Sequence, residues 1–129
     1  MSEEDFNITF TNNGFIKNNH YQLEKVEDDK VVLSAEIMDD SKNPYGIPHG
    51  GFIFGLGDTA MGIAARTTGK KAVTLNANIT FLRPAKGNYL KAEAKIVKDG
   101  KTTAFIKCNI FDNENRQIAS MDSNYYYID

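Results

Sequence analysis

The residue best suited to chemistry is Asp58, which interrupts an apolar and small-residue run over residues 52–65. A carboxylate among apolar neighbours loses several kcal/mol of hydration unless it is hydrogen-bonded, locally solvated or used in a reaction. His49, Gly50 and Gly51 stand at the start of the same run. A glycine amide there can be approached closely by another molecule. The run therefore offers two groups that could take part in chemistry, the Asp58 carboxylate and an accessible backbone amide. The alternative is a structural carboxylate bound to a neighbouring hydroxyl or amide.

A helix from about residue 49 to residue 67 is predicted to carry both groups. Arg66 lies near its negative end and Gly69 follows it, as is typical of a helix C-terminus. The run is apolar or small around most of its circumference, so we expect the helix to be buried on most faces. Four glycines inside it each cost about 1 kcal/mol relative to alanine at an interior site. This cost predicts that neighbours pack very close to the backbone. The four are Gly51, Gly55, Gly57 and Gly62.

The spacing of Gly50 and Asp58 limits what one chain can do. They are eight positions apart, which on an α-helix is about 12 Å of rise. A donor and a base that act on one carbonyl must both lie within about 3 to 4 Å of the reacting atoms. If both residues are catalytic, an antiparallel helix of a second copy must bring its Asp58 beside Gly50. We therefore predict that dimerisation is a condition of activity.

The remaining pattern predicts strands. Residues 21–27 and 31–37 are two short strand-like runs joined at Asp28 and Asp29, and residues 38–48 are typical of a loop. After the helix the apolar period becomes two, which predicts a half-buried strand over residues 73–81. Three more strands in a meander are expected at residues 90–96, 102–111 and 117–128. The result is one α+β domain over residues 1–129, with no structure assigned to residues 1–19.

Composition excludes several classes of protein. The 15 basic and 17 acidic residues are interspersed, so no basic stripe indicates a nucleic-acid partner. The apolar run is shorter than the roughly 20 residues needed to cross a bilayer, so no membrane partner is expected. Cys108 is the single cysteine, which excludes an intrachain disulfide and a multi-cysteine metal site. The acidic N-terminus is unlike a signal peptide. A cytoplasmic protein is expected.

Three segments resemble the PaaI-like (phenylacetate-pathway type) hotdog-fold acyl-CoA thioesterases. They are NPYGIPHGG at 43–51, DTA at 58–60 and NITFLRPA at 78–85. The resemblance extends from about residue 21 to the C-terminus. It implies a hotdog fold, with an antiparallel sheet wrapped around one long central helix. It also implies a homodimer with continuous sheets, often paired into a homotetramer, and hydrolysis of acyl-CoA without metal or organic cofactor.

The resemblance also implies roles for single residues. The catalytic carboxylate of the family falls on Asp58, and its carbonyl-polarising amide falls on Gly50. The supporting polar positions fall on Asn43, His49 and Thr74. Structural alternatives are a helix cap for His49 and a turn for Asn43.

Substrate contacts are expected at five further positions: Gly51, Phe52, Thr59, Arg83 and Lys86. Asp58 either activates water or attacks the carbonyl to form a mixed anhydride. The expected substrate is a small aromatic or short-to-medium-chain acyl-CoA. The alternative function is a non-catalytic acyl-CoA-binding hotdog module.

Overall fold

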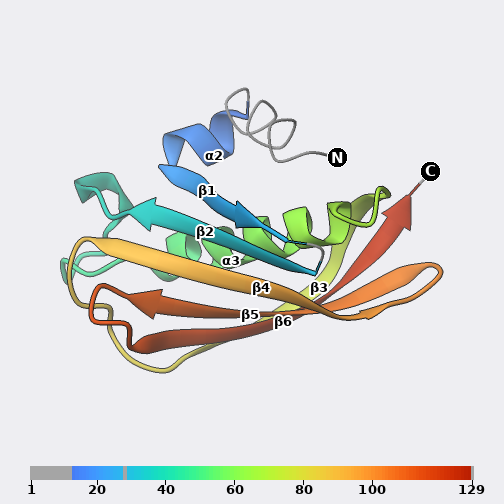
Figure 1. Cartoon of the computed structure of the whole chain (residues 1–129). Helices are drawn as coiled ribbons and strands as arrows, with labels where there is room; N and C mark the ends of the chain where they lie inside the picture. Colours follow the sequence, from blue (N-terminus) through green and yellow to red (C-terminus); the bar gives the residue numbers. More distant parts are fainter. Residues whose placement is uncertain (1–12, 28, 129) are drawn as a thin grey trace.

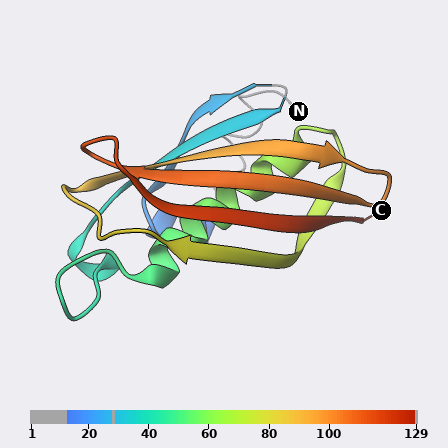
Figure 2. The ribbon, with the colours of Figure 1, turned by 90° about the horizontal axis from the view of Figure 1, so that it is seen from below.

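A six-stranded antiparallel sheet curves around one long helix, α3 (Figures 1 and 2). The computed structural model describes residues 13–27 and 29–128. Within these residues, two helices, one 3-10 turn and six strands follow in the order α2 (Gly14–Asn18), β1 (Tyr21–Val26), β2 (Lys30–Glu36), η1 (Asp39–Ser41), α3 (Gly50–Arg66), β3 (Lys71–Phe81), β4 (Tyr89–Asp99), β5 (Thr103–Asp112) and β6 (Gln117–Ile128). The strand order is β1-β2-β4-β5-β6-β3, and every pair is antiparallel. The predicted α+β arrangement and the β4-β5-β6 meander are confirmed.

Helix α3 is the centre of the core, as predicted. It begins after His49, whose Nδ1 accepts the Gly51 N–H at 2.9 Å, and Gly69 beyond its end has a φ of +89°. The helix side chains Leu56 and Met61 are fully buried. The sheet strands supply the rest of the core, so the helix is enclosed on most faces rather than on one stripe.

Two of the four helix glycines are needed for close packing. A Cβ on Gly57 would overlap the Met121 sulfur of β6, and a Cβ on Gly55 would lie 2.6 Å from the Tyr21 hydroxyl of β1. That hydroxyl donates to the Phe52 carbonyl oxygen at 2.6 Å. At Gly51 and Gly62 the nearest atoms leave 3.1 and 3.5 Å. The prediction of close approach is therefore confirmed most strongly in the middle of the helix.

Strand β3 differs from its prediction. It lies at the edge of the sheet beside β6 alone (Figure 2), and Leu75 and Phe81 are 55% and 52% exposed. The predicted alternation holds from Asn76 to Thr80, where Ala77 and Ile79 are partly buried between exposed neighbours and Ile79 packs against the core. It fails at Leu75, because a β-bulge there shifts the register between Thr74 and Asn76. A bulge changes which residues share a face of the strand. Thr74 thus faces α3 together with Phe81, whereas strict alternation places them on opposite faces.

The first residues and the loops complete the comparison with the sequence. The structure assigns α2, capped by Asn13, within the segment for which no structure was predicted. Residues 1–12 and Asp28, half of the predicted turn, lie outside the described residues. The predicted loop over residues 38–48 contains η1. The other predicted strands match observed ones to within three residues.

Three observations bear on partners. Over residues 13–27 and 29–128, no helix is both long and apolar enough to span a lipid bilayer. The same residues contain no group of three or more His, Cys, Asp or Glu side chains that could hold a metal ion. Cys108 is buried, and this burial raises the pKa of its thiol. A thiol in such surroundings is an inert core side chain.

Candidate active site

Two hydroxyl groups bind one oxygen of the Asp58 carboxylate. Thr74 Oγ1 donates to Oδ1 at 2.9 Å, and the Tyr125 hydroxyl lies 2.5 Å from the same oxygen. The Tyr125 hydroxyl is also 2.7 Å from the Asp58 carbonyl oxygen. Among the described residues, Oδ2 receives no hydrogen bond. The carboxylate is therefore fixed through one oxygen and leaves the other to a ligand.

Asp58 lines a hollow of about 320 Å³, the Asp58 hollow. Its walls come from α2, α3, β3 and β6, and they include Phe15, Thr59 and Arg66. Asp58, Arg66 and Tyr125 are its titratable or charged lining residues. Phe15 is 58% exposed, so α2 presents an aromatic ring close to the carboxylate.

Gly50 lines a second hollow of about 410 Å³, the Gly50 hollow. Asn43, Phe81 and Arg83 contribute to its wall. Gly50 is the first residue of α3, so its N–H has no acceptor within the helix, and none is present elsewhere among the described residues. The positive end of the helix dipole adds to its attraction for a negative charge. Phe81 Cζ would lie 3.2 Å from a Cβ at this position, so glycine keeps the amide accessible.

His49 and Asn43 both make local hydrogen bonds. His49 caps α3 through Nδ1, which places the proton of a neutral ring on Nε2. Asn43 Oδ1 accepts from the backbone N–H groups of Tyr45 and Ile47 at 2.9 and 3.4 Å. The structural alternatives predicted for both residues are thus present in the fold. The Asn43 Nδ2 group has no partner in the described part of the chain and remains able to donate to a ligand.

The Asp58 and Gly50 hollows share no lining residue. A single chain thus keeps the backbone donor and the carboxylate apart, as the helical spacing predicts. Any chemistry that uses both groups on one carbonyl requires a second copy.

The predicted substrate-binding residues are dispersed. Thr59 lines the Asp58 hollow and Arg83 lines the Gly50 hollow. The Gly51 N–H is taken by His49. Phe52 is 6% exposed and packs on Tyr21, with ring centroids 5.4 Å apart. Lys86 is exposed and lines neither hollow, so the fold brings only Thr59 and Arg83 to the hollows.

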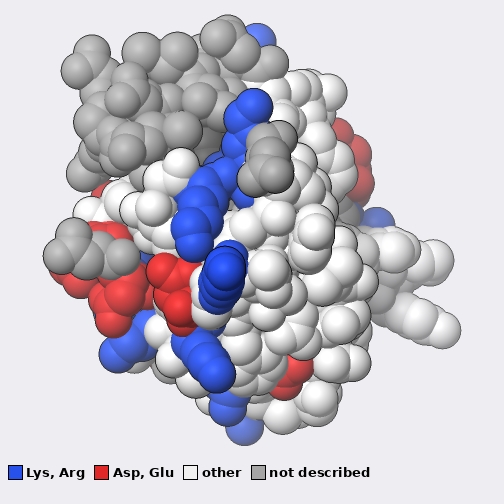
Figure 3. All heavy atoms as spheres, turned by 90° about the vertical axis from the view of Figure 1, so that its right-hand side faces the viewer, with Lys and Arg blue, Asp and Glu red and all other residues white. Residues whose placement is uncertain are grey.

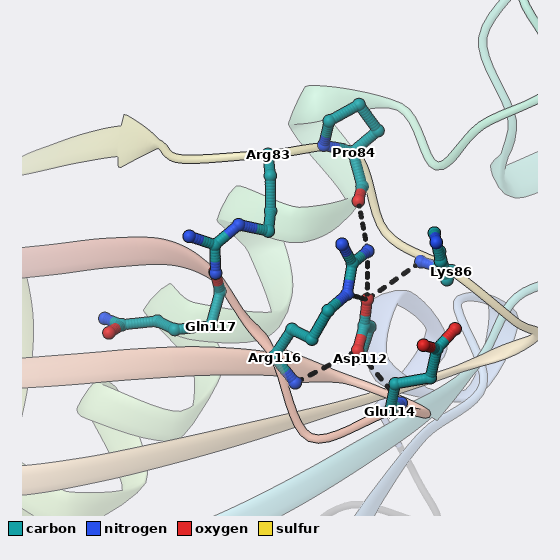
Figure 4. A network of polar contacts seen from close by, with 7 residues as sticks. All are labelled: Arg83, Pro84, Lys86, Asp112, Glu114, Arg116 and Gln117. Carbon is teal, nitrogen blue, oxygen red and sulfur yellow. Dashed lines mark hydrogen bonds and ion pairs between the residues drawn. The ribbon is translucent and has the colours of Figure 1, made fainter.

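A buried carboxylate fixes the segment that carries Arg83 and Lys86 (Figure 4). Asp112 accepts hydrogen bonds from the backbone N–H groups of Lys86, Glu114 and Arg116 and from the Arg116 guanidinium. Arg116 also donates to the Pro84 carbonyl oxygen at 3.1 Å. Burial acts to raise the pKa of Asp112, but these donors outweigh it and lower the pKa to about 2.

Asp112→Asn is expected to destabilise the fold by about 2 kcal/mol at neutral pH, because a pKa near 2 against 3.8 in the free side chain corresponds to this difference. The lowered pKa makes the contribution complete above about pH 4 and removes it as the pH falls toward 2. Urea unfolding at pH 7 and pH 2.5 measures both values. A deficit of equal size at the two pH values would contradict the assignment.

Tyr125 is a site residue that the sequence analysis did not identify. Tyr125, Tyr126 and Tyr127 lie in the strand predicted over residues 117–128, where neighbouring side chains face opposite sides, and Tyr125 and Tyr127 are buried while Tyr126 is exposed. A buried tyrosine hydroxyl needs a partner. Asp58 on the predicted central helix was an available acceptor, and that reasoning could have paired the two residues.

Comparisons with known proteins identify similar sequences and structures. Residues 45–119 match the thioesterase superfamily. The acyl-coenzyme A thioesterase PaaI of Escherichia coli is 31% identical over 90 residues, which are 69% of this chain and 64% of that protein. The structure of E. coli PaaI, from the phenylacetic acid degradation operon, superposes with a TM-score of 0.92 at 24% identity, over 98% of this chain and 92% of the other. The hotdog fold is thereby confirmed.

Two further solved structures are similar. A hypothetical thioesterase of Streptococcus pneumoniae has a TM-score of 0.79 and 29% identity, over 83% of this chain and 88% of the other. These values are for its threonine-to-alanine variant; a second structure has an aspartate, sixteen positions earlier, replaced by alanine, which is the separation of Asp58 and Thr74. The protein smu.793 of Streptococcus mutans, solved bound to acetyl CoA, has a TM-score of 0.80 and 29% identity, over 84% of this chain and 88% of the other.

Proposed function

The chain belongs to the thioesterase superfamily as a PaaI-like hotdog thioesterase, and on that premise we propose that it hydrolyses acyl-coenzyme A thioesters at a site shared by two copies. The proposed substrates carry a small aromatic or short-to-medium-chain acyl group. The observation that carries the proposal is the Asp58 carboxylate, held through Oδ1 by two hydroxyl groups with Oδ2 unpaired in the described residues. The acetyl CoA bound to the Streptococcus mutans relative supports the coenzyme A thioester as ligand.

The Gly50 amide is proposed to bind the thioester carbonyl oxygen. As water or a carboxylate adds to the carbonyl carbon, negative charge develops on that oxygen, and an oriented N–H at a helix start stabilises it. The tetrahedral intermediate then expels the coenzyme A thiolate, which takes up a proton. The Asn43 Nδ2 group lies in the same hollow and is a second candidate donor.

Asp58 is proposed to act through Oδ2. As a general base it accepts a proton from the attacking water, and as a nucleophile it forms a mixed anhydride that water hydrolyses. Thr74 and Tyr125 occupy Oδ1 in either route. The equal aspartate–threonine spacing in the Streptococcus pneumoniae relative supports the assignment of this pair to the site.

A dimer about one two-fold axis would unite the two hollows. Phe54 is the midpoint of Gly50 and Asp58 on α3. On β3, Phe81 lies beside Gly50 and Thr74 contacts Asp58. The bulge removes one residue between them from the ladder, so the midpoint of Thr74 and Phe81 is Asn78. One axis near both midpoints would pair the β3 edges and place each Gly50 beside the partner's Asp58.

The open edge of β3 supports this pairing. Edge strands with exposed apolar side chains are sites of strand addition, and Leu75 and Phe81 would be covered by the partner strand. A tetramer of two such dimers and a cytoplasmic location stay predictions from the sequence.

Basic side chains are available for the coenzyme A phosphates. Arg83 borders the Gly50 hollow, where its guanidinium donates to the Gln117 carbonyl oxygen at 2.7 Å, and Lys86 follows on the same segment. A band of Lys and Arg also crosses the end of the molecule at which α3 terminates (Figure 3). Arg66, Lys70 and Lys71 line a hollow at that helix end. An antiparallel partner would bring its Arg66 toward the Gly50 hollow.

The proposal is tested by release of free thiol from a panel of acyl-CoAs, from acetyl through medium-chain to phenylacetyl and hydroxybenzoyl. We expect turnover for at least one acyl class, with a preference that identifies the substrate. Tight acyl-CoA binding without turnover across the panel would contradict the enzyme and favour the alternative of a binding module. Binding is measured by calorimetry with the same ligands.

A further inference from the structure

We propose that Tyr125 is a positioning residue, which locks the Asp58 carboxylate with Oδ1 occupied so that Oδ2 faces the reacting carbonyl. The inference rests on the proposed function, because it assigns Tyr125 a role that acts through Asp58. It concerns a residue on the last strand of the sheet, 67 positions from the carboxylate in sequence.

The Tyr125 hydroxyl contacts both the side chain and the backbone of Asp58. The Tyr125 hydroxyl is 2.5 Å from the Asp58 side-chain Oδ1 and 2.7 Å from the Asp58 backbone oxygen. A hydroxyl between these two acceptors ties the side chain to its own backbone and so restricts its torsions. Thr74 approaches the same Oδ1 from β3, so the carboxylate is held from two strands at once.

The Tyr125 side chain is buried and closely packed. It is 2% exposed, and its ring lies 3.5 Å from the position of a Cβ on Gly62, one helical turn beyond Asp58. Burial raises the pKa of Tyr125, and the nearby Asp58 charge adds to the effect. The hydroxyl therefore remains a donor at neutral pH. A rigid ring with a permanent O–H is suited to fixing a carboxylate and unsuited to transferring a proton.

Tyr127 provides a matched control on the same strand. It is 9% exposed, and its hydroxyl donates to the Asp99 carboxylate at 2.6 Å. Tyr125→Phe and Tyr127→Phe each remove one partly buried tyrosine–carboxylate hydrogen bond and keep the ring. Asp99 lines neither the Asp58 hollow nor the Gly50 hollow, so only the first substitution should affect chemistry.

We expect Tyr125→Phe to lower kcat by about thirtyfold, since a hydrogen bond to a charged group contributes on this scale, with KM nearly unchanged. Tyr127→Phe should keep the wild-type kcat, and the two variants should have similar melting temperatures. In an Asp58→Asn background, Tyr125→Phe should have no further effect on kcat, because the two residues act as a unit. Steady-state kinetics on the best acyl-CoA and thermal unfolding give all of these values.

Several results would overturn the inference. They are a wild-type kcat in Tyr125→Phe, an equal fall in Tyr127→Phe, or a thirtyfold further loss when Tyr125→Phe is added to Asp58→Asn. Failure of the proposed function is distinct: the wild-type chain would then lack turnover, or Asp58→Asn would leave it intact. A crystal structure of Tyr125→Phe adds a readout without activity, in which the Asp58 side chain is expected to leave its wild-type torsion angles; an unchanged Asp58 conformation would contradict the inference.

Discussion

Asp58→Asn is expected to reduce kcat by about a thousandfold, within the range of general acid–base contributions, while the fold is retained. Asparagine has the size of aspartate, and its side-chain oxygen can still accept from Thr74 and Tyr125. It supplies neither a base nor a nucleophile in place of Oδ2. The measurement is thiol release at saturating acyl-CoA, together with calorimetric binding of the same ligand, which should persist.

Asp29→Asn is the matched control for this substitution. Asp29 lies between β1 and β2, at the far edge of the sheet from β3, pairs with Lys95 Nζ at 3.9 Å and lines neither hollow. This substitution removes a carboxylate away from the proposed site and the proposed dimer axis, and kcat should equal that of the wild type. Wild-type turnover in Asp58→Asn would remove Asp58 from the mechanism.

Gly50→Pro is expected to lower kcat by a hundredfold or more, about the effect of removing one oxyanion donor, and to be rescued by a partner chain that carries Asp58→Asn. Proline lacks the N–H but is well tolerated at the first helical position. His49, with φ −63° and ψ 141°, already has a conformation that suits the residue before proline. The heterodimer then contains one intact Gly50–Asp58 pair and one doubly defective pair.

The two chains are co-expressed with different tags and the heterodimer is isolated through both. Its activity should be about half that of the wild-type dimer, because one of the two symmetric sites is complete. Gly50→Ala keeps the N–H and is the control for added bulk, since its Cβ would lie 3.2 Å from the exposed ring of Phe81. A heterodimer as inactive as its two parents would show that each site is built within one chain.

Much of the fold was predictable because local pattern and tertiary role agree. The apolar run around Asp58 predicts a helix that is enclosed by a sheet, and apolar and polar residues alternate along the strands of the meander. The position of β3 at the sheet edge was not predictable from its period of two. The sequence of an edge strand has the same apolar–polar alternation as that of a central strand if its exposed apolar side chains pack against a partner chain.

The site was predictable in part for similar reasons. Asp58 was identified from its residue type and Gly50 from the family resemblance, and their separation on the helix followed from the rise per residue. The Tyr125–Asp58 contact and the Lys86–Asp112 contact join segments that meet only after folding, whereas the bonds from Glu114 and Arg116 to Asp112 are local. The five N–H groups around Asp112 come from three positions on two segments, and none is marked by a motif.

The bulge at Leu75 exchanges the faces on which odd- and even-numbered residues of β3 lie. On its C-terminal side the odd-numbered Phe81 covers the start of the helix, and on its N-terminal side the even-numbered Thr74 faces the helix. In a regular strand, residues an odd number of positions apart, such as Thr74 and Phe81, face opposite sides along the whole length. Because Leu75 lies outside the ladder, Thr74 and Phe81 of this eleven-residue strand face the same side. The strand can therefore present apolar side chains to a second chain and the Thr74 hydroxyl to Asp58 of its own chain.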